Sequence, residues 1–577
     1  MKLSDKKSVQ QIVMTLASLG VTEVIICPGS RNAPLILSFN RHPAFHCTSI
    51  RDERSAAFFA LGKSLQLRQP VALVCTSGSA ALNFAPAIAE AYYQRIPLLV
   101  FTADRPAEWT GQGDGQTIWQ TDIYHNYIRK SYTLYGDADS ANEYWHNQRC
   151  LHEGFSIATQ NDAGPVHFNI PLQEPLYGAA VAEDFVPAKF EQVSPEHRLT
   201  TEQLATFRQL YAQSKKVMIL AGQQWHEDEL NNIIQAFEPF ENTVVLTEST
   251  SNIDADFTIK NIDRCITTLD ETGAPHYMPD LLITVGGAIV SKRIKALLRK
   301  YKPALHWNIH PYDAQVDTYQ SLTHPVFMEA PAFLSQLLPE LSAAPSGYRQ
   351  IWQKRNAALQ SLHDDFSSTA AYSDFYVFDH LFKKIPDQVL HLGNSSPVRY
   401  AQLFTNGQHI RTWSNRGTSG IDGCTSTVMG CAAANPQKQF LLITGDVAFF
   451  YDNNALWNDG RVNNLRIILI NNGGGGIFRI ISGAEAAGEM ETFFETAHHK
   501  SAKKLAEFYE WNYLAASDAP SLQASLQSFF EPGNEKSILE IFTPADVNPQ
   551  VLNNYWKFLK EKYTTDEQTK LGNHQSV

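Results

Sequence analysis

The sequence predicts an α/β protein built from three consecutive doubly wound parallel-sheet domains, and three observations support this fold class. Short apolar runs rich in β-branched residues alternate with stretches of helical periodicity, as in sheets buried on both faces. A chain of 577 residues is also too long to fold around a single hydrophobic core. Finally, Pro, Ser and Ala interrupt the pattern at two segments, 186–199 and 338–348, which divide the runs into three groups.

Each group supplies four expected strands. The predicted domain at 1–185 has them within 21–29, 71–78, 96–104 and 164–171. The predicted domain at 200–340 has them within 215–223, 242–249, 280–287 and 303–311. The predicted domain at 355–562 has them within 388–395, 439–446, 465–472 and 537–544. Residues 563–577 are polar and unpatterned, so a disordered tail is expected there.

Composition and charge narrow the functional class and the location. The formal net charge of -12 argues against general nucleic-acid binding, although it allows a local basic pocket for an acidic metabolite. The seven cysteines form no CxxC pair and several lie in apolar segments, so we expect them to be reduced and structural. The sequence has neither a leader-like N-terminus nor an apolar run of 18 residues. We therefore expect a cytoplasmic protein without a membrane span.

The segment 468–478, ILINNGGGGIF, requires an explanation because glycine loses more conformational entropy on folding than any other residue. A dinucleotide fingerprint needs GxGxxG after a strand, and a P-loop needs GxxxxGK followed by Ser or Thr. Neither pattern is present in this segment. Gly286 and Gly287 follow another expected strand, but the third glycine is missing there as well.

The end of a second expected strand is predicted to lie next to the glycine run. The expected strand within 439–446 ends at Gly445 and Asp446, and one helix and one strand separate it from Asn472. Because the carboxyl ends of parallel strands meet at one edge of a sheet, Asp446 and Asn472 are predicted to converge. Their oxygens and a backbone carbonyl suit Mg²⁺ shared with a diphosphate. The alternative is structural: Asp446 caps a helix and the glycines form a turn.

Glu53 is the candidate acid of the first domain, in TSIRDERSAAFFALG at 48–62. It immediately precedes a helix of small residues. By itself it is better explained as a solvated first-turn residue that the helix dipole favours. Together with the GD and NN segments, however, it resembles the thiamine diphosphate (ThDP) enzymes, in which a glutamate of one domain activates a cofactor held by another. The segment at 76–106 also resembles the pyrimidine-binding domain of these enzymes.

Six cations stand beside small or turn-forming residues, in a pattern typical of rigid anion sites. Individually each is explained as a surface or salt-bridge residue, but jointly they indicate substrates with several carboxylates. They are Arg31, Arg105, Lys292, Arg293, Arg399 and Arg416.

Four segments narrow the resemblance: CPGSRNAPL at 27–35, the stretch 102–120, GNSSPVRY at 393–400 and SNRGTSGIDG at 414–423. They resemble the family of 2-succinyl-5-enolpyruvyl-6-hydroxy-3-cyclohexene-1-carboxylate synthases of menaquinone biosynthesis. The resemblance extends through all three expected domains, a pyrimidine-binding, a central and a diphosphate-binding domain. It implies a ThDP- and Mg²⁺-dependent transferase that joins decarboxylated 2-oxoglutarate to isochorismate by conjugate addition.

The resemblance also implies roles for individual residues. Asp446, Asn472 and the carbonyl of Gly474 are implied as ligands of the metal, Mg²⁺ or Mn²⁺. Glu53 is implied as the acid that activates the cofactor, and Ile421 as the residue that supports its bent shape. Ile477 and Phe478 are implied as walls of the cofactor pocket. Those implied for catalysis and substrate binding are Ser395, Arg399 and Arg416 around the succinyl carboxylate, with Arg31, Arg105, Gln116, Lys292 and Arg293.

Other interpretations remain open. The resemblance implies a homodimer or homotetramer with sites shared between subunits, and symmetric dimers are common in any case. The rival functions are another ThDP carboligase such as an acetohydroxyacid synthase, a non-catalytic ThDP-binding sensor, and an NAD-dependent dehydrogenase. His498 and His499, in the polar stretch ETAHHKSAKK, are interpreted as a solvated helix end.

Overall fold

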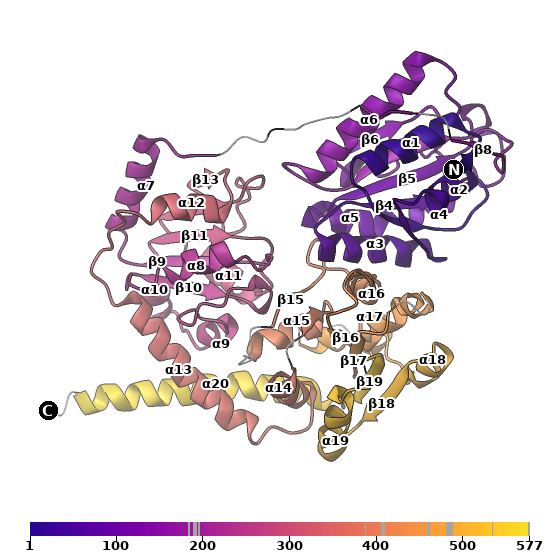
Figure 1. Ribbon diagram of the computed structural model, residues 1–577. Coiled ribbons are helices and arrows are strands. Elements are labelled where there is room, and N and C mark those ends of the chain that lie inside the picture. The colour runs from indigo at the N-terminus through magenta and orange to yellow at the C-terminus, as the bar shows by residue number, and fades with distance from the viewer. Residues whose placement is uncertain are drawn as a thin grey trace. The chain divides into compact units, whose positions relative to one another are not determined.

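The computed structural model covers residues 1–577 (Figure 1). It describes the whole chain except 183–184, 189–192, 194–196, 387, 405–409, 459–461, 481–488, 534 and 575–577, and beyond residue 564 it describes the backbone alone.

The first sheet has six parallel strands in the order β3-β2-β4-β5-β7-β6. Figure 1 shows α1 and α6 on one face of this sheet and α3 and α5 on the other. The central strands are fully buried because helices cover both faces, which explains their continuous apolar runs. The strands are β2 (Glu23–Ile26), β3 (His46–Ser49), β4 (Val71–Cys75), β5 (Leu98–Asp104), β6 (Lys130–Thr133) and β7 (Val166–Pro171). The helices are α1 (Lys7–Ser18), α2 (Ala33–Arg41), α3 (Glu53–Leu67), α4 (Ser79–Asn83), α5 (Ala85–Gln94) and α6 (Ala141–Thr159), and an antiparallel pair is formed by β1 (Lys2–Ser4) and β8 (Ala179–Val181).

The second sheet has five parallel strands in the order β10-β9-β11-β12-β13. The strands are β9 (Val217–Ala221), β10 (Thr243–Thr247), β11 (Leu281–Val285), β12 (Leu305–Ile309) and β13 (His324–Val326). The helices are α7 (Thr201–Gln213), α8 (Asp228–Gln235), α9 (Ile262–Thr267), α10 (Ala274–Tyr277), α11 (Lys292–Lys300) and α12 (Ala330–Leu337).

The third sheet has six strands in the order β15-β14-β16-β17-β19-β18. The strands are β14 (Val389–Leu392), β15 (Thr412–Trp413), β16 (Phe440–Gly445), β17 (Leu465–Asn471), β18 (Asn512–Ala516) and β19 (Ser537–Phe542). The helices are α13 (Tyr348–Ser367), α14 (Asp374–Lys384), α15 (Ser396–Tyr400), α16 (Cys424–Ala434), α17 (Asp446–Tyr451), α18 (Lys503–Phe508), α19 (Ala519–Phe530) and α20 (Val547–His574).

The predicted fold class is thus confirmed, and all twelve predicted strands are present. The C-terminus differs from the prediction of a disordered tail, because α20 continues as helix through 563–574. Extending a helix that is already formed costs far less than starting one, so the packed part of α20 supports a polar extension that has no core-facing pattern of its own.

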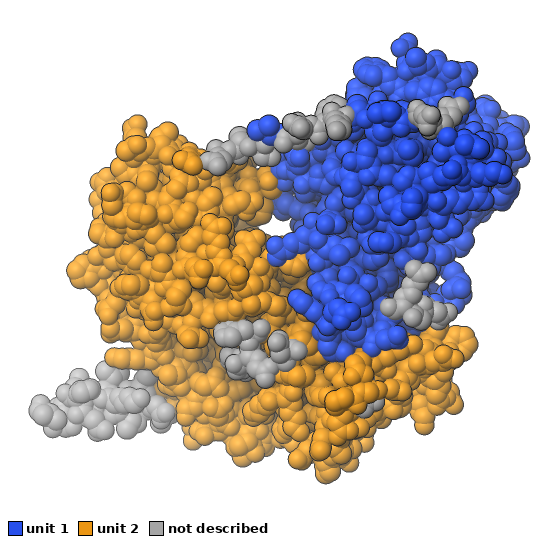
Figure 2. Space-filling model, in the orientation of Figure 1, with its two compact units in different colours: residues 1–194, 415–440, 448–465 blue, residues 195–414, 441–447, 466–577 orange. Residues whose placement is uncertain are grey.

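Contacts group the described residues into two compact units (Figure 2). The first unit contains residues 1–194, 415–440 and 448–465, and the second contains 195–414, 441–447 and 466–577. By its contacts α16 therefore belongs with α3, in the first unit. The two helices approach so closely that a Cβ on Gly62 would lie 1.9 Å from the carbonyl oxygen of Thr427. The predicted domain boundaries at 185, 200, 340 and 355 stay predictions.

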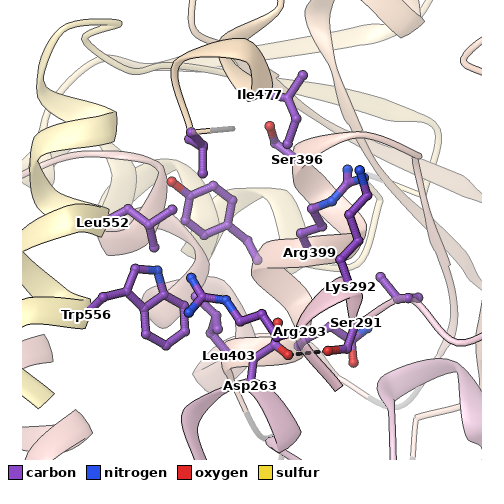
Figure 3. A pocket seen from close by; sticks show the side chains of 14 residues that line it. Asp263, Ser291, Lys292, Arg293, Ser396, Arg399, Leu403, Ile477, Leu552 and Trp556 are labelled. Atoms are coloured by element: carbon purple, nitrogen blue, oxygen red, sulfur yellow. Dashed lines mark hydrogen bonds between the residues drawn. The ribbon is translucent and has the colours of Figure 1, made fainter. Parts of the chain in front are cut away.

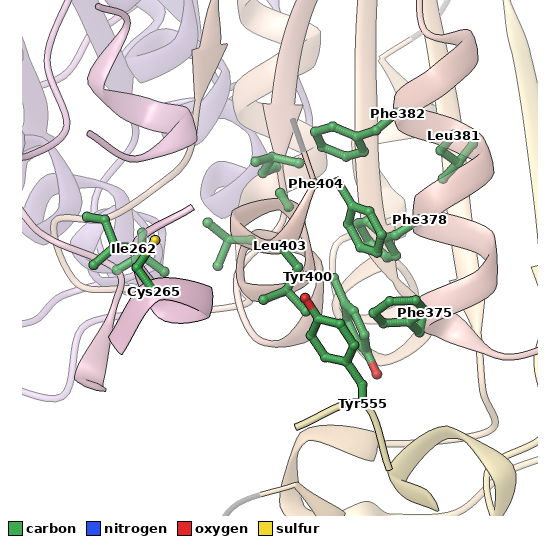
Figure 4. Close-up of a cluster of buried hydrophobic side chains, with 14 of the residues drawn as sticks. Ile262, Cys265, Phe375, Phe378, Leu381, Phe382, Tyr400, Leu403, Phe404 and Tyr555 are labelled. Atoms are coloured by element: carbon green, nitrogen blue, oxygen red, sulfur yellow. The ribbon is translucent and has the colours of Figure 1, made fainter. Parts of the chain in front are cut away.

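An aromatic core supports one end of the second unit (Figure 4). Phe375 and Phe378 on α14 face inward, and the ring centroid of Phe375 lies 4.7 Å from that of Tyr555 on α20. Phe378 stacks on Tyr400 at 5.2 Å. Burying each such ring contributes about 1.5–3 kcal/mol. The core therefore fixes α14, α20 and α15 relative to one another.

No described helix combines the length and the apolarity needed to cross a lipid bilayer.

Candidate active site

The strand ends meet in the second unit as the topology predicts. Strand β16 ends at Gly445 and α17 begins at Asp446, while β17 ends just before Asn472. The Asp446 carboxylate accepts N–H groups from three residues: Oδ1 accepts that of Val447 at 2.7 Å, and Oδ2 accepts those of Gly473 at 2.8 Å and Gly474 at 2.9 Å. The aspartate and the glycine run are thus in direct contact, although 26 residues separate Asp446 from Gly473.

The glycines are needed because the loop turns sharply against a neighbouring segment. Gly473 has φ +80° and Gly474 has φ +156°, which are conformations that residues with a Cβ rarely adopt. A Cβ on Gly474 would also lie 2.7 Å from the carbonyl oxygen of Glu495. That same oxygen accepts the Gly475 N–H at 2.7 Å. The run therefore lets the backbone pass close to a second backbone segment while its amides face Asp446.

The electrostatics of this strand end suit a cation. Burial, with a smaller effect of the Asp374 charge, raises the pKa of Asp446 to about 7, while the three N–H donors oppose the rise. Asp374 also accepts a hydrogen bond from Asn472 Nδ2 at 3.1 Å. A bound divalent cation would favour the ionised carboxylate. The described residues hold no cluster of three or more His, Cys, Asp or Glu side chains, so a cation here would depend on one carboxylate with amide, carbonyl and ligand oxygens.

His498 differs from its interpretation as part of a solvated helix end. Its N–H donates to the Gly473 carbonyl at 2.8 Å, and its Nε2 lies 3.5 Å from Asp446 Oδ2. The side chain is mostly buried, and burial, with the charges of Lys500 and His499, lowers the pKa of the imidazole. His498 therefore belongs to the surroundings of Asp446, and its polar sequence neighbours gave no sign of this.

A cavity of about 450 Å³ in the second unit gathers four of the predicted site residues (Figure 3). Lys292, Arg293 and Arg399 supply three cations, and Ile477 supplies part of an apolar wall. The other residues lining the cavity are Asp263, Val290, Ser291, Ser396, Tyr400, Gln402, Leu403, Ile480, Leu552 and Trp556. A site that is largely apolar with a few converging charges is typical of small-molecule binding.

The three cations are held in different ways. Figure 3 shows the side chains of Lys292 and Arg399 converging near Ser396, whereas Arg293 extends toward Trp556. Arg399 donates from Nη1 to the carbonyl of Ser395 at 2.5 Å, and Ser395 itself has φ +72°. Arg293 donates from Nη1 to Thr267 Oγ1 at 2.7 Å, and its guanidinium carbon lies 4.2 Å from the Trp556 ring centroid.

Lys292 and Arg399 therefore form one anion-attracting end of the cavity, while Arg293 is stacked along its wall. Phe478 is not part of the cavity lining, and its ring packs at 5.7 Å from that of Phe494.

In the first unit, Arg31 and Arg105 meet at one acid. Arg31 is buried and donates to the Leu172 carbonyl at 2.9 Å and to Glu174 Oε1 at 3.2 Å. Arg105 Nη1 lies 3.7 Å from the same Glu174 oxygen, and Arg105 Nη2 donates to the Gly115 carbonyl at 3.1 Å.

Gln116 follows in the same loop, with φ +54°, and its backbone would lie 3.2 Å from a Cβ on Gly78. The structure thus brings Arg31, Arg105 and the loop that carries Gln116 together.

Glu53 is the first residue of α3, one position further into the helix than predicted. The preceding Asp52 caps the helix by accepting the N–H groups of Arg54 at 2.9 Å and Ser55 at 3.3 Å. Glu53 Oε2 is within 3.4 Å of the Asn83 amide nitrogen. Its charge also adds to the effect of burial in raising the pKa of the Cys75 thiol. Glu53 is thus half-buried at a capped helix start.

Arg416 and Ile421 lie on a loop that a buried acid holds. Glu90 on α5 has no exposed surface, and its oxygens accept the N–H of Gly417 at 2.8 Å and both the N–H and the hydroxyl of Thr418 at 2.6 Å. Ile421 is half-buried in the same loop. Sequence reasoning missed Glu90 because the acid lies in an ordinary helical pattern, more than 320 residues before its partners.

Comparisons with known proteins agree with the resemblance. Residues 6–124 match the family model for the N-terminal TPP binding domain of thiamine pyrophosphate enzymes, and residues 393–541 match the model for their C-terminal TPP binding domain.

Curated relatives that carry the name 2-succinyl-5-enolpyruvyl-6-hydroxy-3-cyclohexene-1-carboxylate synthase match over nearly the whole chain. The relative from Flavobacterium psychrophilum is 42% identical over 558 residues, which cover 95% of this chain and 98% of the relative. That from Porphyromonas gingivalis is 39% identical over 566 residues, covering 96% and 98%. That from Christiangramia forsetii is 37% identical over 579 residues, covering 97% and 100%.

Proposed function

The chain belongs to the family of 2-succinyl-5-enolpyruvyl-6-hydroxy-3-cyclohexene-1-carboxylate synthases, and we propose that it catalyses the reaction of that name in menaquinone biosynthesis. In this reaction 2-oxoglutarate loses carbon 1 as CO₂, and its remaining four carbons are joined to the ring alkene of isochorismate. Both substrates are dicarboxylates. The enzyme is accordingly a ThDP-dependent transferase.

The cavity of the second unit is the observation that best supports this function. It places Lys292 and Arg399 together at one end and lines the rest with apolar side chains that include Ile477 and Leu403. Paired cations bind and orient a carboxylate, and orienting two reactants is worth about 7–11 kcal/mol of barrier in favourable cases. The apolar lining excludes water, which strengthens these charge interactions.

For the remaining predicted residues we propose the roles that the family resemblance implies. Thiamine diphosphate, when bound, supplies the electron sink for decarboxylation of a 2-oxo acid. Asp446, Asn472 and the carbonyl of Gly474 would hold the Mg²⁺ or Mn²⁺ that binds its diphosphate, and Ile421 would support its bent shape. Glu53 would hold a proton on its carboxyl group against the cofactor's pyrimidine ring. Arg31, Arg105, Gln116, Ser395 and Arg416 complete the proposed substrate site.

Assembly and location extend the proposal. We expect a homodimer or homotetramer in which subunits share active sites. We also expect a cytoplasmic location, with which the free state of all seven cysteines agrees.

The leading alternative is another ThDP carboligase, such as an acetohydroxyacid synthase. The acceptor substrate of that enzyme is small, and it would not require three cations around the cavity. A non-catalytic ThDP sensor would have no need of Glu53.

One experiment separates these functions. The protein is incubated with ThDP, Mg²⁺, 2-oxoglutarate and isochorismate, and isochorismate loss and CO₂ release are followed together. We expect both to occur in equal amounts, and only when all components are present. Acetolactate formation from pyruvate alone would favour the acetohydroxyacid synthase, and ThDP binding without turnover of either substrate pair would favour the sensor.

A further inference from the structure

Glu248 does not line the cationic cavity, but it contacts two residues that do, Val290 and Ser291. It follows β10, is only 5% exposed, and carries a carboxylate whose two oxygens are both bonded to backbone. Oε2 accepts the N–H of Val290 at 2.6 Å and Oε1 accepts the N–H of Ser291 at 2.7 Å. Such paired, charge-assisted bonds fix both the position and the direction of the segment that donates them.

That segment leads directly into the cations. Ser291 is the N-cap of α11, its Oγ accepts the N–H of Ile294 at 3.1 Å, and Lys292 and Arg293 are the first two residues of the helix. The Ser291 hydroxyl also donates to Asp263 in the cavity wall (Figure 3). A shift of Val290 and Ser291 would therefore turn both cations at once.

The residue after Glu248 contacts a second residue that lines the cavity. Ser249 donates its N–H to Gln402 Oε1 at 3.2 Å and accepts from Gln402 Nε2 at 2.7 Å. Gln402 lines the cavity, and its Nε2 also lies within 3.2 Å of the Val398 carbonyl, next to Arg399. The pair of residues after β10 thus holds the start of α11 through Glu248 and, through Ser249 and Gln402, contacts α15, which carries Arg399.

We propose that Glu248 is a positioning residue for the proposed reaction, whose carboxylate fixes Val290 and Ser291 so that Lys292 is oriented, beside Arg399, to bind a substrate carboxylate. This role rests on the proposed function of the cavity. It does not require Glu248 to touch a substrate.

The role carries a dependence on pH. Burial raises the pKa of Glu248 to about 7, the two N–H donors oppose the rise, and the nearby groups are Asp263, which adds to it, and Lys295, which lowers it. Tyr319 also faces Glu248, whose charge contributes to the raised pKa of the phenol. A protonated carboxyl presents one acceptor in place of two. The segment therefore loosens as the pH falls through about 7, and dicarboxylate binding weakens with it.

The test compares Glu248→Gln with the wild type, both loaded with ThDP and Mg²⁺. The amide keeps the shape but faces one backbone N–H with an NH₂ group, so it cannot accept both bonds. Succinate is the probe because it is a dicarboxylate with no keto group to react. We expect its Kd, measured by calorimetry, to rise about tenfold or more, in line with the loss of a hydrogen bond to a charged group. The KM for 2-oxoglutarate should rise similarly.

The pH profile and two further variants separate positioning from general stability. The wild-type KM for 2-oxoglutarate should rise as the pH falls from about 8 to about 6. The KM of Glu248→Gln for the same substrate should not change over that range. Glu238→Gln, at an exposed position, is the matched control and should behave as the wild type. Glu248→Asp keeps the charge but is one methylene too short to reach both amides, so it should bind succinate as poorly as the Gln variant, and it serves if that variant does not fold.

Succinate binding equal to wild type in either Glu248 variant would overturn the proposal, as would a wild-type protein that does not bind succinate. A wild type that binds succinate but does not consume isochorismate would overturn the proposed function instead, and the binding comparison would still decide the role of Glu248.

Discussion

Removing the Glu90 carboxylate should free the loop that carries Arg416 and Ile421. The acid is fully buried and receives two backbone N–H groups and one hydroxyl from Gly417 and Thr418. A hydrogen bond to a charged group contributes about 1.5–3 kcal/mol, so the two backbone bonds together are worth about 3–6 kcal/mol. Thr418 is exposed and water replaces part of this loss, which leaves about 2–4 kcal/mol for the loop in Glu90→Ala.

Hydrogen exchange measures this directly. A loss of about 2–4 kcal/mol in the free energy of local opening should speed exchange of the Gly417 and Thr418 amides by about 30-fold to about 1000-fold, since about 1.4 kcal/mol is tenfold. Glu90→Gln keeps one acceptor and should show a smaller increase. Glu202→Gln, at an exposed position on α7, should change nothing in this loop.

Unchanged protection of the loop in Glu90→Ala would show that other contacts hold it, and would refute the reasoning. Acceleration spread evenly over the whole chain would do the same, because it would mean that the variant had lost global stability rather than one local anchor.

Three other substitutions test separate parts of the structure. Glu53→Gln should keep the fold and ThDP binding yet lose most turnover, because an amide cannot hold the exchangeable proton of a carboxyl group; near-normal kcat would refute the assigned role. Arg399→Ala should raise the KM for 2-oxoglutarate while leaving ThDP affinity unchanged, because Arg399 lines the cavity proposed to bind the substrate; weaker ThDP binding with unchanged turnover would count against it. Gly62→Ala should destabilise the first unit by about 1–3 kcal/mol or more and lower its melting temperature, since the new Cβ would lie 1.9 Å from the Thr427 carbonyl oxygen. Gly347→Ala, whose Cβ would lie 3.8 Å from the nearest atom, is its control, and equal melting of the two variants would contradict the close packing.

The sequence was sufficient for the central strands because these are buried on both faces and so appear as uninterrupted apolar runs. The strands it did not predict are short, and five of them are edge strands of the three large sheets, where a polar pattern is tolerated. The seven unpredicted strands are β1, β3, β6, β8, β13, β15 and β18. The helical C-terminus was missed for a related reason, since packing upstream rather than local pattern sustains it.

For the candidate site, the sequence was informative where chemistry is carried by a local motif. The convergence of Asp446 with the glycine run follows from parallel topology alone, and the contact of Asp446 with Gly473 and Gly474 agrees with it. Glu90 and Glu248 could not be predicted in this way. Each is an acid in an ordinary strand-end or helical context, and its role depends on backbone amides supplied from elsewhere in the chain.

The fate of individual carbon atoms of 2-oxoglutarate tests the carboligation most directly. With substrate labelled with ¹³C at carbon 1, all of the label should leave as CO₂. With the label at carbon 2, it should appear in a product whose mass equals isochorismate plus 2-oxoglutarate minus CO₂. Labelled CO₂ released without any joined product, or no release in the presence of ThDP, Mg²⁺ and isochorismate, would contradict the proposed function.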